Sequence, residues 1–312
     1  MDVSVILVTR NTCALTRAAV QSVLDSPGAP AREIFVVDSG STDGTAAVLP
    51  REFPQIQFLR SEQNLGFARA VNLAAQKAAG DFLLLLNSDA RLAPDALARA
   101  VTWMRGHPDV AVAGAQLLNP DDTRQNAIAN FPTLATELLN KSLLRRLRPP
   151  KYPGKELEFR EPVEVESVVG AFMLVRKSAW DALGGLDERY FFFFEETDFC
   201  LQARRKGYRT FHLPSVHVWH GQGQSARQVA AGARIEYWRS RYAYFAKNHS
   251  PAARRILTAG LAVRLLFDSL AAGLFVLATF GKNARWQNRW QVCKALLRWH
   301  LRGQPADMGL PR

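Results

Sequence analysis

The chain has 312 residues, 48% of them apolar, so it can form one large domain with a sizeable core and an appendage. Its three cysteines, Cys13, Cys200 and Cys293, are far apart, which excludes a zinc-ligand spacing and a disulfide framework. A strand-like run follows Met1 directly and does not fit a secretory signal, so we expect a cytosolic compartment.

The net charge of +12 is concentrated at one end of the sequence. Residues 225–312 contain 15 Lys and Arg against three acidic residues, whereas residues 1–224 contain 25 of each. The neutral first part does not suit a nucleic-acid-binding protein. The basic last part predicts contact with an anionic partner, and its residue pattern must decide which one.

Strands and helices are expected to alternate through the first 90 residues. Residues 3–8 predict a strand followed by a helix over residues 12–24, and two more strands are expected at residues 33–37 and 56–59. Residues 82–86 are all apolar, which is typical of a central strand buried on both faces. The pattern predicts an α/β fold with a mostly parallel sheet and helices on both faces.

Polar clusters follow three of these strands, at residues 9–11, 38–43 and 87–89. Ligands of such sheets bind beyond the carboxyl ends of the strands. A single cluster is equally well explained as a turn or a helix cap. Three at successive strand ends favour a binding site.

The sequence becomes irregular over residues 119–164, which contain several prolines and a basic patch at residues 141–155. We expect a mobile loop with a short helix there, where an acceptor enters. Regular structure is expected again over residues 167–175, and a strand is expected over residues 210–213 that ends at the Pro214 turn.

Asp89, in the sequence Asn87-Ser88-Asp89, is a candidate ligand for a divalent cation that bridges two phosphates, because hard cations prefer oxygen ligands. The alternative is that Asp89 caps a helix beginning near Pro94. Glu195 and Glu196 stand at a predicted helix start, where the helix dipole keeps a general base ionised. Ordinary first-turn acids are the alternative there.

Two histidines, His217 and His220, follow the last predicted strand. Strand alternation places them on opposite faces. Each is either a hydrogen-bonded structural residue or a metal ligand. An imidazole beside a carboxylate suits Mn²⁺ at least as well as Mg²⁺.

Several motifs together resemble glycosyltransferase family 2, which has the GT-A fold. In chain order they are residues 3–11, 37–45, 64–68, 86–89, 170–175, 184–188, 194–200 and 219–220. They span about the first 70% of the chain. Each motif is modest, but their ordered series is specific.

The resemblance implies a role for each matching residue. Glu196 is the catalytic base, with Glu195 and Asp198 as supporting carboxylates, and Asp89 and His220 hold the metal. The implied donor-binding residues are Thr9, Asn11, Asp38, Gly66, Asn87, Ser88 and Asp89. The chain departs from the family in having Asn87 for the first Asp of the DxD triplet, and Glu196 where Asp is frequent.

The implied reaction is an inverting single displacement on a nucleotide sugar. The triplet and the aromatic run before Glu195 resemble rhamnosyltransferases of cell-surface polysaccharide assembly, which implies dTDP-rhamnose or a UDP-sugar as donor. The acceptor is then a glycan or a polyprenyl-diphosphate-linked glycan. We expect residues 1–118 to bind the donor, residues 119–224 to bind the acceptor, and residues 225–312 to form a separate helical region.

The C-terminal region predicts a peripheral membrane contact on the cytoplasmic face. Residues 256–280 are apolar but contain Arg264 and Asp268, which favours an interfacial or re-entrant helix pair over a full span. In the next helix, Trp286, Trp290, Cys293, Leu297 and Leu301 share one face, flanked by Arg285, Arg289, Lys294, Arg298 and Arg302. This pattern suits an anionic membrane, and the alternative is a helix packed on the catalytic domain.

Two other functions remain open. One is a catalytically idle nucleotide-sugar-binding or scaffold protein, which the two departures favour. The other is a nucleic-acid-binding protein, which only the charge favours. We expect no nucleic-acid partner, because the apolar stripe of the last helix is too continuous, and a homo-oligomer is compatible with the sequence.

Overall fold

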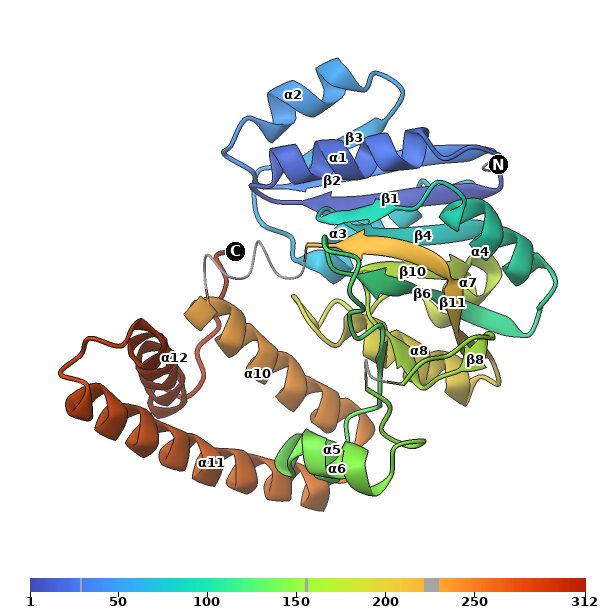
Figure 1. Cartoon of the computed structure of the whole chain (residues 1–312). Helices are drawn as coiled ribbons and strands as arrows, with labels where there is room; N and C mark the ends of the chain where they lie inside the picture. Colours follow the sequence, from blue (N-terminus) through green and yellow to red (C-terminus); the bar gives the residue numbers. More distant parts are fainter. Residues whose placement is uncertain (29, 155–156, 222–229) are drawn as a thin grey trace. The chain divides into compact units, whose positions relative to one another are not determined.

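The computed structural model describes residues 1–28, 30–154, 157–221 and 230–312 (Figure 1). The chain forms two compact units. The sheet unit comprises Met1–Phe131, Ser142–Phe191 and Glu195–Ser225, and the helical unit comprises Pro132–Lys141, Phe192–Phe194 and Ala226–Arg312. The boundary predicted between residues 224 and 225 lies outside the described residues, as does Lys155 of the predicted basic patch.

A nine-stranded sheet forms the centre of the sheet unit. Its strands in spatial order are β3 (Gln57–Ser61), β2 (Arg32–Ser39), β1 (Val3–Thr9), β4 (Phe82–Asn87), β10 (Phe172–Arg176), β6 (Val110–Leu118), β11 (Arg209–His220) and β5 (Ala90–Leu92), with β8 (Val163–Glu164) paired to β11. Strand β10 is antiparallel to both of its neighbours, but most paired residues of the sheet lie in parallel pairs. The predicted α/β fold with a mostly parallel sheet is confirmed.

The apolar run at residues 82–86 is the predicted central strand, because β4 lies between β1 and β10 and all five residues are buried. Its side chains alternate between two layers. Leu84 and Leu86 join a core that includes residues of helices α1 (Cys13–Leu24) and α4 (Ala96–Arg105). Helix α3 (Phe67–Ala75) packs on β1 and β2 from the other face. The remaining helices of the unit are α2 (Thr45–Glu52), α6 (Lys141–Leu147), α7 (Lys177–Leu183) and α8 (Glu195–Arg205).

Residue Asp89 does not cap a helix, so that alternative is excluded. The residues after it form strand β5, and α4 begins at Ala96 with Asp95 as its N-cap residue. Strand β5 pairs with β11, where Ala90 lies opposite His220. Asp89 is therefore held beside the end of β11.

The expected ordered segment at residues 167–175 and the expected strand at residues 210–213 differ from the observed elements. The ordered segment expected over residues 167–175 consists of β9 (Ser167–Val168), which pairs with β7 (Ile128–Ala129), and most of β10. The expected turn at Pro214 is a bulge inside β11: Leu213 lies opposite Ala115, and His217 lies opposite the next residue of β6. A proline in a strand is tolerated at a bulge because it donates no ladder hydrogen bond there.

The described part of the helical unit contains three long helices, α10 (Ala230–Asn248), α11 (Pro251–Ala278) and α12 (Ala284–Leu301), and the short α5 (Leu134–Leu138). Ser250 caps α11 through its side chain, and Pro251 occupies the first turn, where its missing N–H costs nothing. Residues 256–280 thus belong largely to one continuous helix, and the expected helix pair within them is wrong.

A buried ion pair ties α5 to α10. The guanidinium of Arg241 lies 2.8 Å from the carboxylate of Glu137, and both side chains are nearly inaccessible to solvent. The Arg241 guanidinium also lies 4.8 Å from the centre of the Tyr237 ring. Removing either partner would leave a buried charge unpaired, which costs about 3–5 kcal/mol.

Helix α12 packs against α10 and α11, and its buried residues are Cys293, Leu296 and Trp299. The ring of Trp286 stacks on Phe275 of α11, with ring centres 4.2 Å apart. Leu301, expected on the apolar face, is 87% exposed. The predicted stripe is therefore corrected: its tryptophans contact α11, and the buried face is turned toward Leu296 and Trp299.

Helix α11 exposes the larger apolar surface of this unit. Within the described part of the chain, α11 is the helix that is both long enough and apolar enough to cross a membrane. Length and composition alone are weak evidence that it does so. Its exposed apolar residues are Ile256, Val263, Leu266, Phe267, Leu270, Leu274, Phe275 and Leu277. Asp268 is paired with Arg289 of α12 at 2.6 Å.

Candidate active site

The three predicted polar clusters meet at one edge of the sheet. In the parallel registers, Thr9 lies opposite Asp38, and Val8 lies opposite Asn87. The carboxyl ends of β1, β2 and β4 therefore lie side by side. Figure 1 shows these three strands next to one another. The structure therefore brings Thr9, Asp38 and Asn87, three of the predicted donor-binding residues, to one edge.

Asp38 is fully buried at the end of β2. Its Oδ1 accepts a hydrogen bond from the Ser41 amide at 3.0 Å, whereas its Oδ2 is buried with no hydrogen-bond partner among the described residues. A buried carboxylate oxygen without a partner is costly, so such an atom indicates a missing donor. An N–H of a nucleobase would supply that donor.

Thr9 and Ser88 belong to a buried hydroxyl cluster. The Oγ1 of Thr9 lies 3.0 Å from Thr12 Oγ1 and 2.8 Å from Thr16 Oγ1. Thr12 donates to Ser88 Oγ at 3.2 Å. The cluster ties the ends of β1 and β4 to the start of α1. It gives Thr9 a supporting role, and its contact with a donor stays a prediction.

Asn11 joins the first two polar clusters. Its backbone is left-handed, with a φ of 54°, which asparagine tolerates better than most residues. Its Oδ1 accepts from the Thr42 amide at 2.7 Å, and its own amide donates to Ser41 Oγ at 3.0 Å. Asn11 thus fixes the loop that follows β2 and carries Ser41 and Thr42.

Gly66 stands where the backbone of another segment comes very close. It has a φ of 74°, and a β-carbon built there would lie 2.4 Å from the carbonyl oxygen of Phe191. The next amide, of Phe67, donates to the same oxygen at 2.8 Å. Only glycine fits, which explains this residue without a ligand. Its predicted donor contact is not tested by the structure.

Asp89 and His220 lie together, as the metal hypothesis requires. The Nε2 of His220 is 3.4 Å from Asp89 Oδ1, and both side chains are buried. Asn87 Nδ2 lies 3.5 Å from the same nitrogen. His217, on the other face of β11, is exposed. Strand alternation thus separates the two histidines as predicted.

The described residues contain no cluster of three or more His, Cys, Asp and Glu side chains that would hold a metal by itself. Two protein ligands still fit a cation that is shared with a diphosphate, because Mg²⁺-type sites commonly use one or two carboxylates plus substrate phosphates. One carboxylate oxygen and one imidazole nitrogen facing each other are a suitable pair for this purpose.

Sequence reasoning missed Gln125, which holds His220. The Oε1 of Gln125 lies 3.0 Å from His220 Nδ1, and its Nε2 donates to the His220 carbonyl oxygen at 2.6 Å. Gln125 is buried although it lies in the segment expected to be an irregular loop. A lone glutamine between prolines carries no sequence signal, because only the fold places it beside β11.

Glu195 and Glu196 begin α8, as predicted. Each has its Oε2 buried with no hydrogen-bond partner among the described residues. Burial raises the pKa of Glu195 well above its usual range, and the adjacent Glu196 carboxylate raises it further. Burial also raises the pKa of Glu196. A carboxylate whose pKa is raised toward neutrality is suited to general-base catalysis.

The segment Gly170–Ala171 connects the two acidic motifs. A β-carbon built on Gly170 would lie 3.7 Å from Cγ of Glu196, so this glycine lines the side chain of Glu196. The next residue, Ala171, accepts a hydrogen bond from the Asn87 amide at 3.1 Å. Glu196 and the Asn87-Ser88-Asp89 triplet therefore border the same short stretch of backbone.

Asp198 is turned along its own helix. Its Oδ1 accepts from Gln202 Nε2, one turn further on, at 3.2 Å, and its side chain is buried. The structure thus places Asp198 where it stabilises the first turn of α8. Its predicted role as a supporting carboxylate is compatible with this position and stays a prediction.

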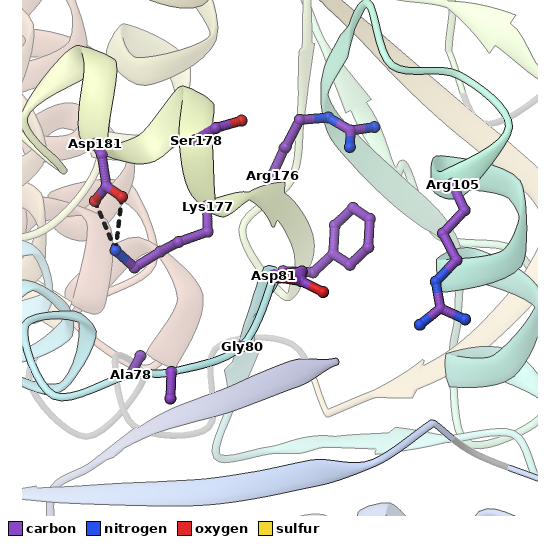
Figure 2. A pocket seen from close by; sticks show the side chains of 10 residues that line it. Ala78, Gly80, Asp81, Arg105, Arg176, Lys177, Ser178 and Asp181 are labelled. Atoms are coloured by element: carbon purple, nitrogen blue, oxygen red, sulfur yellow. Dashed lines mark hydrogen bonds and ion pairs between the residues drawn. The ribbon is translucent and has the colours of Figure 1, made fainter. Parts of the chain in front are cut away.

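A cavity of about 600 Å³ lies at the opposite edge of the sheet, where β4 begins and β10 ends (Figure 2). Lys177 Nζ bonds both carboxylate oxygens of Asp181 at 2.7 and 2.8 Å. Arg176 donates to three backbone carbonyls, and Arg105 pairs with Asp2. These three cations are thus already satisfied within the protein.

The fold defines a class: an α/β protein of the GT-A type, with buried polar and acidic residues at the carboxyl ends of its strands. The family model of glycosyl transferase family 2 matches residues 4–184, more than half of the chain. The chain belongs to glycosyl transferase family 2 and is a glycosyltransferase.

Curated relatives include rhamnosyltransferases. The chain is 26% identical over 232 residues to the N-acetylglucosaminyl-diphospho-decaprenol L-rhamnosyltransferase of Mycobacterium tuberculosis. The matched region covers 70% of this chain and 75% of that enzyme. It is 27% identical over 171 residues to the rhamnosyltransferase WbbL of Escherichia coli K12, covering 54% and 62%. The predicted resemblance to this branch is confirmed.

Solved structures share the fold. The mannosyltransferase PcManGT of Pyrobaculum calidifontis, in complex with GDP-Man and Mn²⁺, aligns with a TM-score of 0.56 at 19% identity, over 96% of this chain and 86% of that one. S. aureus TarS in complex with UDP-GlcNAc aligns with a TM-score of 0.53 at 19% identity, over 94% and 79%. At such identities the likeness supports the GT-A fold alone.

Proposed function

We propose that this glycosyltransferase moves a sugar, with rhamnose as the preferred candidate, from a nucleoside diphosphate to a hydroxyl group of an acceptor by one inverting displacement. Support for rhamnose comes from the two rhamnosyltransferase relatives. Support for a polyprenyl-diphosphate-linked glycan as acceptor comes from the decaprenol-linked sugar in the name of the mycobacterial relative. Residues 1–118 would bind the donor and residues 119–224 the acceptor.

The donor, dTDP-rhamnose or a UDP-sugar, would lie along the edge formed by β1, β2 and β4. The unpartnered Oδ2 of Asp38 would accept the N–H of the pyrimidine base. Asn11, Gly66 and Ser88 would shape the same edge through the contacts described above. The diphosphate would then reach Asn87 and Asp89.

A divalent cation, Mn²⁺ or Mg²⁺, would be held by Asp89 and His220, whose facing atoms are 3.4 Å apart. When bound, such an ion neutralises the charge that develops on a leaving diphosphate. Asn87 cannot add a negative charge to the site, but its amide nitrogen lies 3.5 Å from the imidazole and helps to fix it.

Glu196 would act as the base, and its buried, unpartnered Oε2 is the single observation that carries the proposal. Glu196 takes the proton of the acceptor hydroxyl as the hydroxyl oxygen bonds to the anomeric carbon. The bond from that carbon to the diphosphate breaks on the opposite face. Burial raises the pKa of Glu196 itself, and Asp198 supports the first turn of α8.

The decisive experiment measures nucleoside diphosphate release with dTDP-rhamnose, UDP-sugars and GDP-sugars, each with a lipid-diphosphate sugar acceptor and Mn²⁺. Wild type is expected to turn over one donor, and Glu196→Gln to lose about 10²- to 10⁴-fold in kcat, as for removal of a general base. A chelator should abolish turnover. Donor binding with no release from any pair would instead favour the idle nucleotide-sugar-binding protein, the function that Asn87 and Glu196 leave open.

We further propose that the helical unit holds the enzyme peripherally on an anionic membrane, at the cytoplasmic face, where a lipid-linked acceptor lies. Helix α11 exposes apolar side chains three, four and seven residues apart, with Phe267 69% and Leu277 73% exposed. Such a face suits the interfacial region of a bilayer. The flanking basic residues of α12 would each add about 1 kcal/mol on an anionic surface.

Vesicle sedimentation tests this placement. Phe267→Ser/Leu270→Ser/Leu274→Ser and Arg285→Ser/Arg289→Ser/Lys294→Ser/Arg298→Ser should each release the protein from phosphatidylglycerol vesicles. Arg145→Ser/Arg146→Ser/Arg148→Ser, which removes similar charge from the segment around α6, should not. Undiminished binding of the first two variants contradicts the proposal. A change of oligomeric state in the apolar variant, without vesicle binding by wild type, would show that a second copy covers α11.

A further inference from the structure

The orientation of the Gln125 side chain is fixed by its neighbours. Its amide nitrogen, Nε2, lies 2.6 Å from the carbonyl oxygen of His220 and 2.8 Å from Asn119 Oδ1. A carbonyl oxygen only accepts hydrogen bonds, so the nitrogen of the Gln125 amide must face this side. Its Oε1 consequently faces Nδ1 of His220, at 3.0 Å.

The same polarity extends along the loop to a carboxylate. Thr123 Oγ1 donates to Asp121 Oδ1 at 2.6 Å, and this bond lowers the pKa of Asp121, which keeps it ionised and able only to accept. Thr123 Oγ1 therefore accepts from Asn119 Nδ2, at 2.8 Å. Asn119 Oδ1 is then the acceptor for Gln125. One carboxylate thus sets the direction of four hydrogen bonds in series.

The series ends on the ring of His220 and determines where its proton lies. Because Gln125 Oε1 can only accept, Nδ1 of His220 must be the donor. In the neutral ring, Nε2 then carries the lone pair. This lone pair faces Asp89 Oδ1 at 3.4 Å, and the one donor beside it, Asn87 Nδ2, lies 3.5 Å away, too far for a strong hydrogen bond. Two acceptors that face each other are a poor contact for the protein alone and a good one for a cation between them.

We propose that Gln125 is a positioning residue: it holds His220 as the Nδ1–H tautomer and so presents Nε2, together with Asp89, to the metal. This inference rests on the proposed function, since it assigns Gln125 a part in the same metal site. Gln125 itself touches neither the cation nor the donor. Outer hydrogen-bond partners of this kind commonly change metal affinity or activity by about 10- to 100-fold when they are removed.

The first test needs no substitution. Nitrogen-15 NMR of histidine-labelled wild type, without metal at pH 8, distinguishes a protonated Nδ1 from a protonated Nε2. Only six histidines have to be assigned, and the missing signal in His220→Ala identifies the one that matters. The Nδ1–H tautomer is expected. The Nε2–H tautomer would overturn the proposal.

The second test measures Mn²⁺ binding by electron paramagnetic resonance, with Mn²⁺ alone and with Mn²⁺ plus dTDP. Gln125→Met keeps a similar side-chain length but removes the acceptor for Nδ1, so Mn²⁺ affinity should fall by about 10- to 100-fold. The matched control is Trp219→Phe, which removes the 2.7 Å bond from Trp219 Nε1 to Asp122 Oδ1. That bond joins the same loop to the same strand without touching the imidazole, and affinity should stay within about twofold.

His220→Ala distinguishes a failure of the proposed metal site from a failure of the proposed role of Gln125. If it leaves Mn²⁺ affinity unchanged, the proposed metal site fails whatever Gln125 does. If it weakens binding while Gln125→Met binds as wild type does, the metal site stands and the role of Gln125 is refuted. A loss in Trp219→Phe equal to that in Gln125→Met would reduce Gln125 to a general support of the loop, and would also overturn the proposal.

Discussion

The two edges of the central sheet differ in how completely their polar groups are paired. At the amino-end edge, a cavity of about 600 Å³ is lined by Arg105, Arg176 and Lys177, and each of them has protein partners. At the carboxyl-end edge, the buried oxygens Asp38 Oδ2 and Glu196 Oε2 have none among the described residues.

This difference shows that unmet hydrogen-bonding capacity locates the site better than empty volume does. A buried carboxylate oxygen without a partner costs free energy in the unliganded protein, so it persists where a ligand supplies the partner. A salt bridge that is already closed, such as Lys177 with Asp181, offers nothing further to a ligand. Substitutions at either edge test whether the unpaired oxygens, rather than the cavity, mark the active site.

The largest effect is expected at Asp38. Asp38→Asn keeps an oxygen for the Ser41 amide and places an N–H₂ group where Oδ2 was unpartnered. Two donors then face each other when the base binds, so KM for the donor should rise by about 10- to 100-fold, or about 1.4–2.8 kcal/mol, with a smaller change in kcat. Steady-state kinetics with the accepted donor measure this. An unchanged KM would remove Asp38 from the donor site.

A moderate effect is expected from the glutamate pair. Burial raises the pKa of Glu196, so the base is lost as pH falls through a value above the ordinary glutamate pKa of about 4.3. Burial and the Glu196 charge raise the pKa of Glu195 further than that of Glu196, so Glu195 is already neutral where Glu196 titrates. Glu195→Gln should therefore leave the acid limb of the kcat/KM profile in place. At pH 7 the rate should change by less than about tenfold. A limb that moves to lower pH would show that Glu195 carries a negative charge while Glu196 titrates.

The smallest effect is expected at the amino-end edge. Lys177→Met/Asp181→Leu removes a partly exposed pair four residues apart on α7, a type worth about 0.3–0.5 kcal/mol. Activity should stay within about twofold of wild type, and thermal unfolding should shift by a few degrees at most. A tenfold loss of kcat would mean that this cavity takes part in the reaction, and the distinction between the edges would fall.

Much of the fold could be predicted from the sequence, because buried strands and helix starts leave local patterns. The five apolar residues at 82–86 predicted the central strand, and Glu195 was predicted at the start of a helix that begins there. The meeting of Asp38 and Asn87 at one edge followed from parallel strand direction alone.

Long-range contacts left no such pattern. Gln125 reaches His220 across 95 positions, and the bulge at Pro214 depends on what β6 offers as a partner. The face of α12 was misassigned at Leu301 because periodicity gives the width of an apolar stripe but not which part of it a neighbouring helix covers. In this chain the packing of α12 against α10 and α11 determines which of its residues are buried.

The bulge in β11 also determines which face of the strand each later side chain occupies, including that of His220. Three residues, Pro214, Ser215 and Val216, are looped out between Leu213 and His217, and every side chain after them takes its orientation from that count. Adding one residue to the three without local compensation would exchange the inward and outward positions, so Trp219 would occupy the position that His220 now holds. The length of this insertion, rather than the identity of its residues, therefore decides whether an imidazole or an indole faces Asp89.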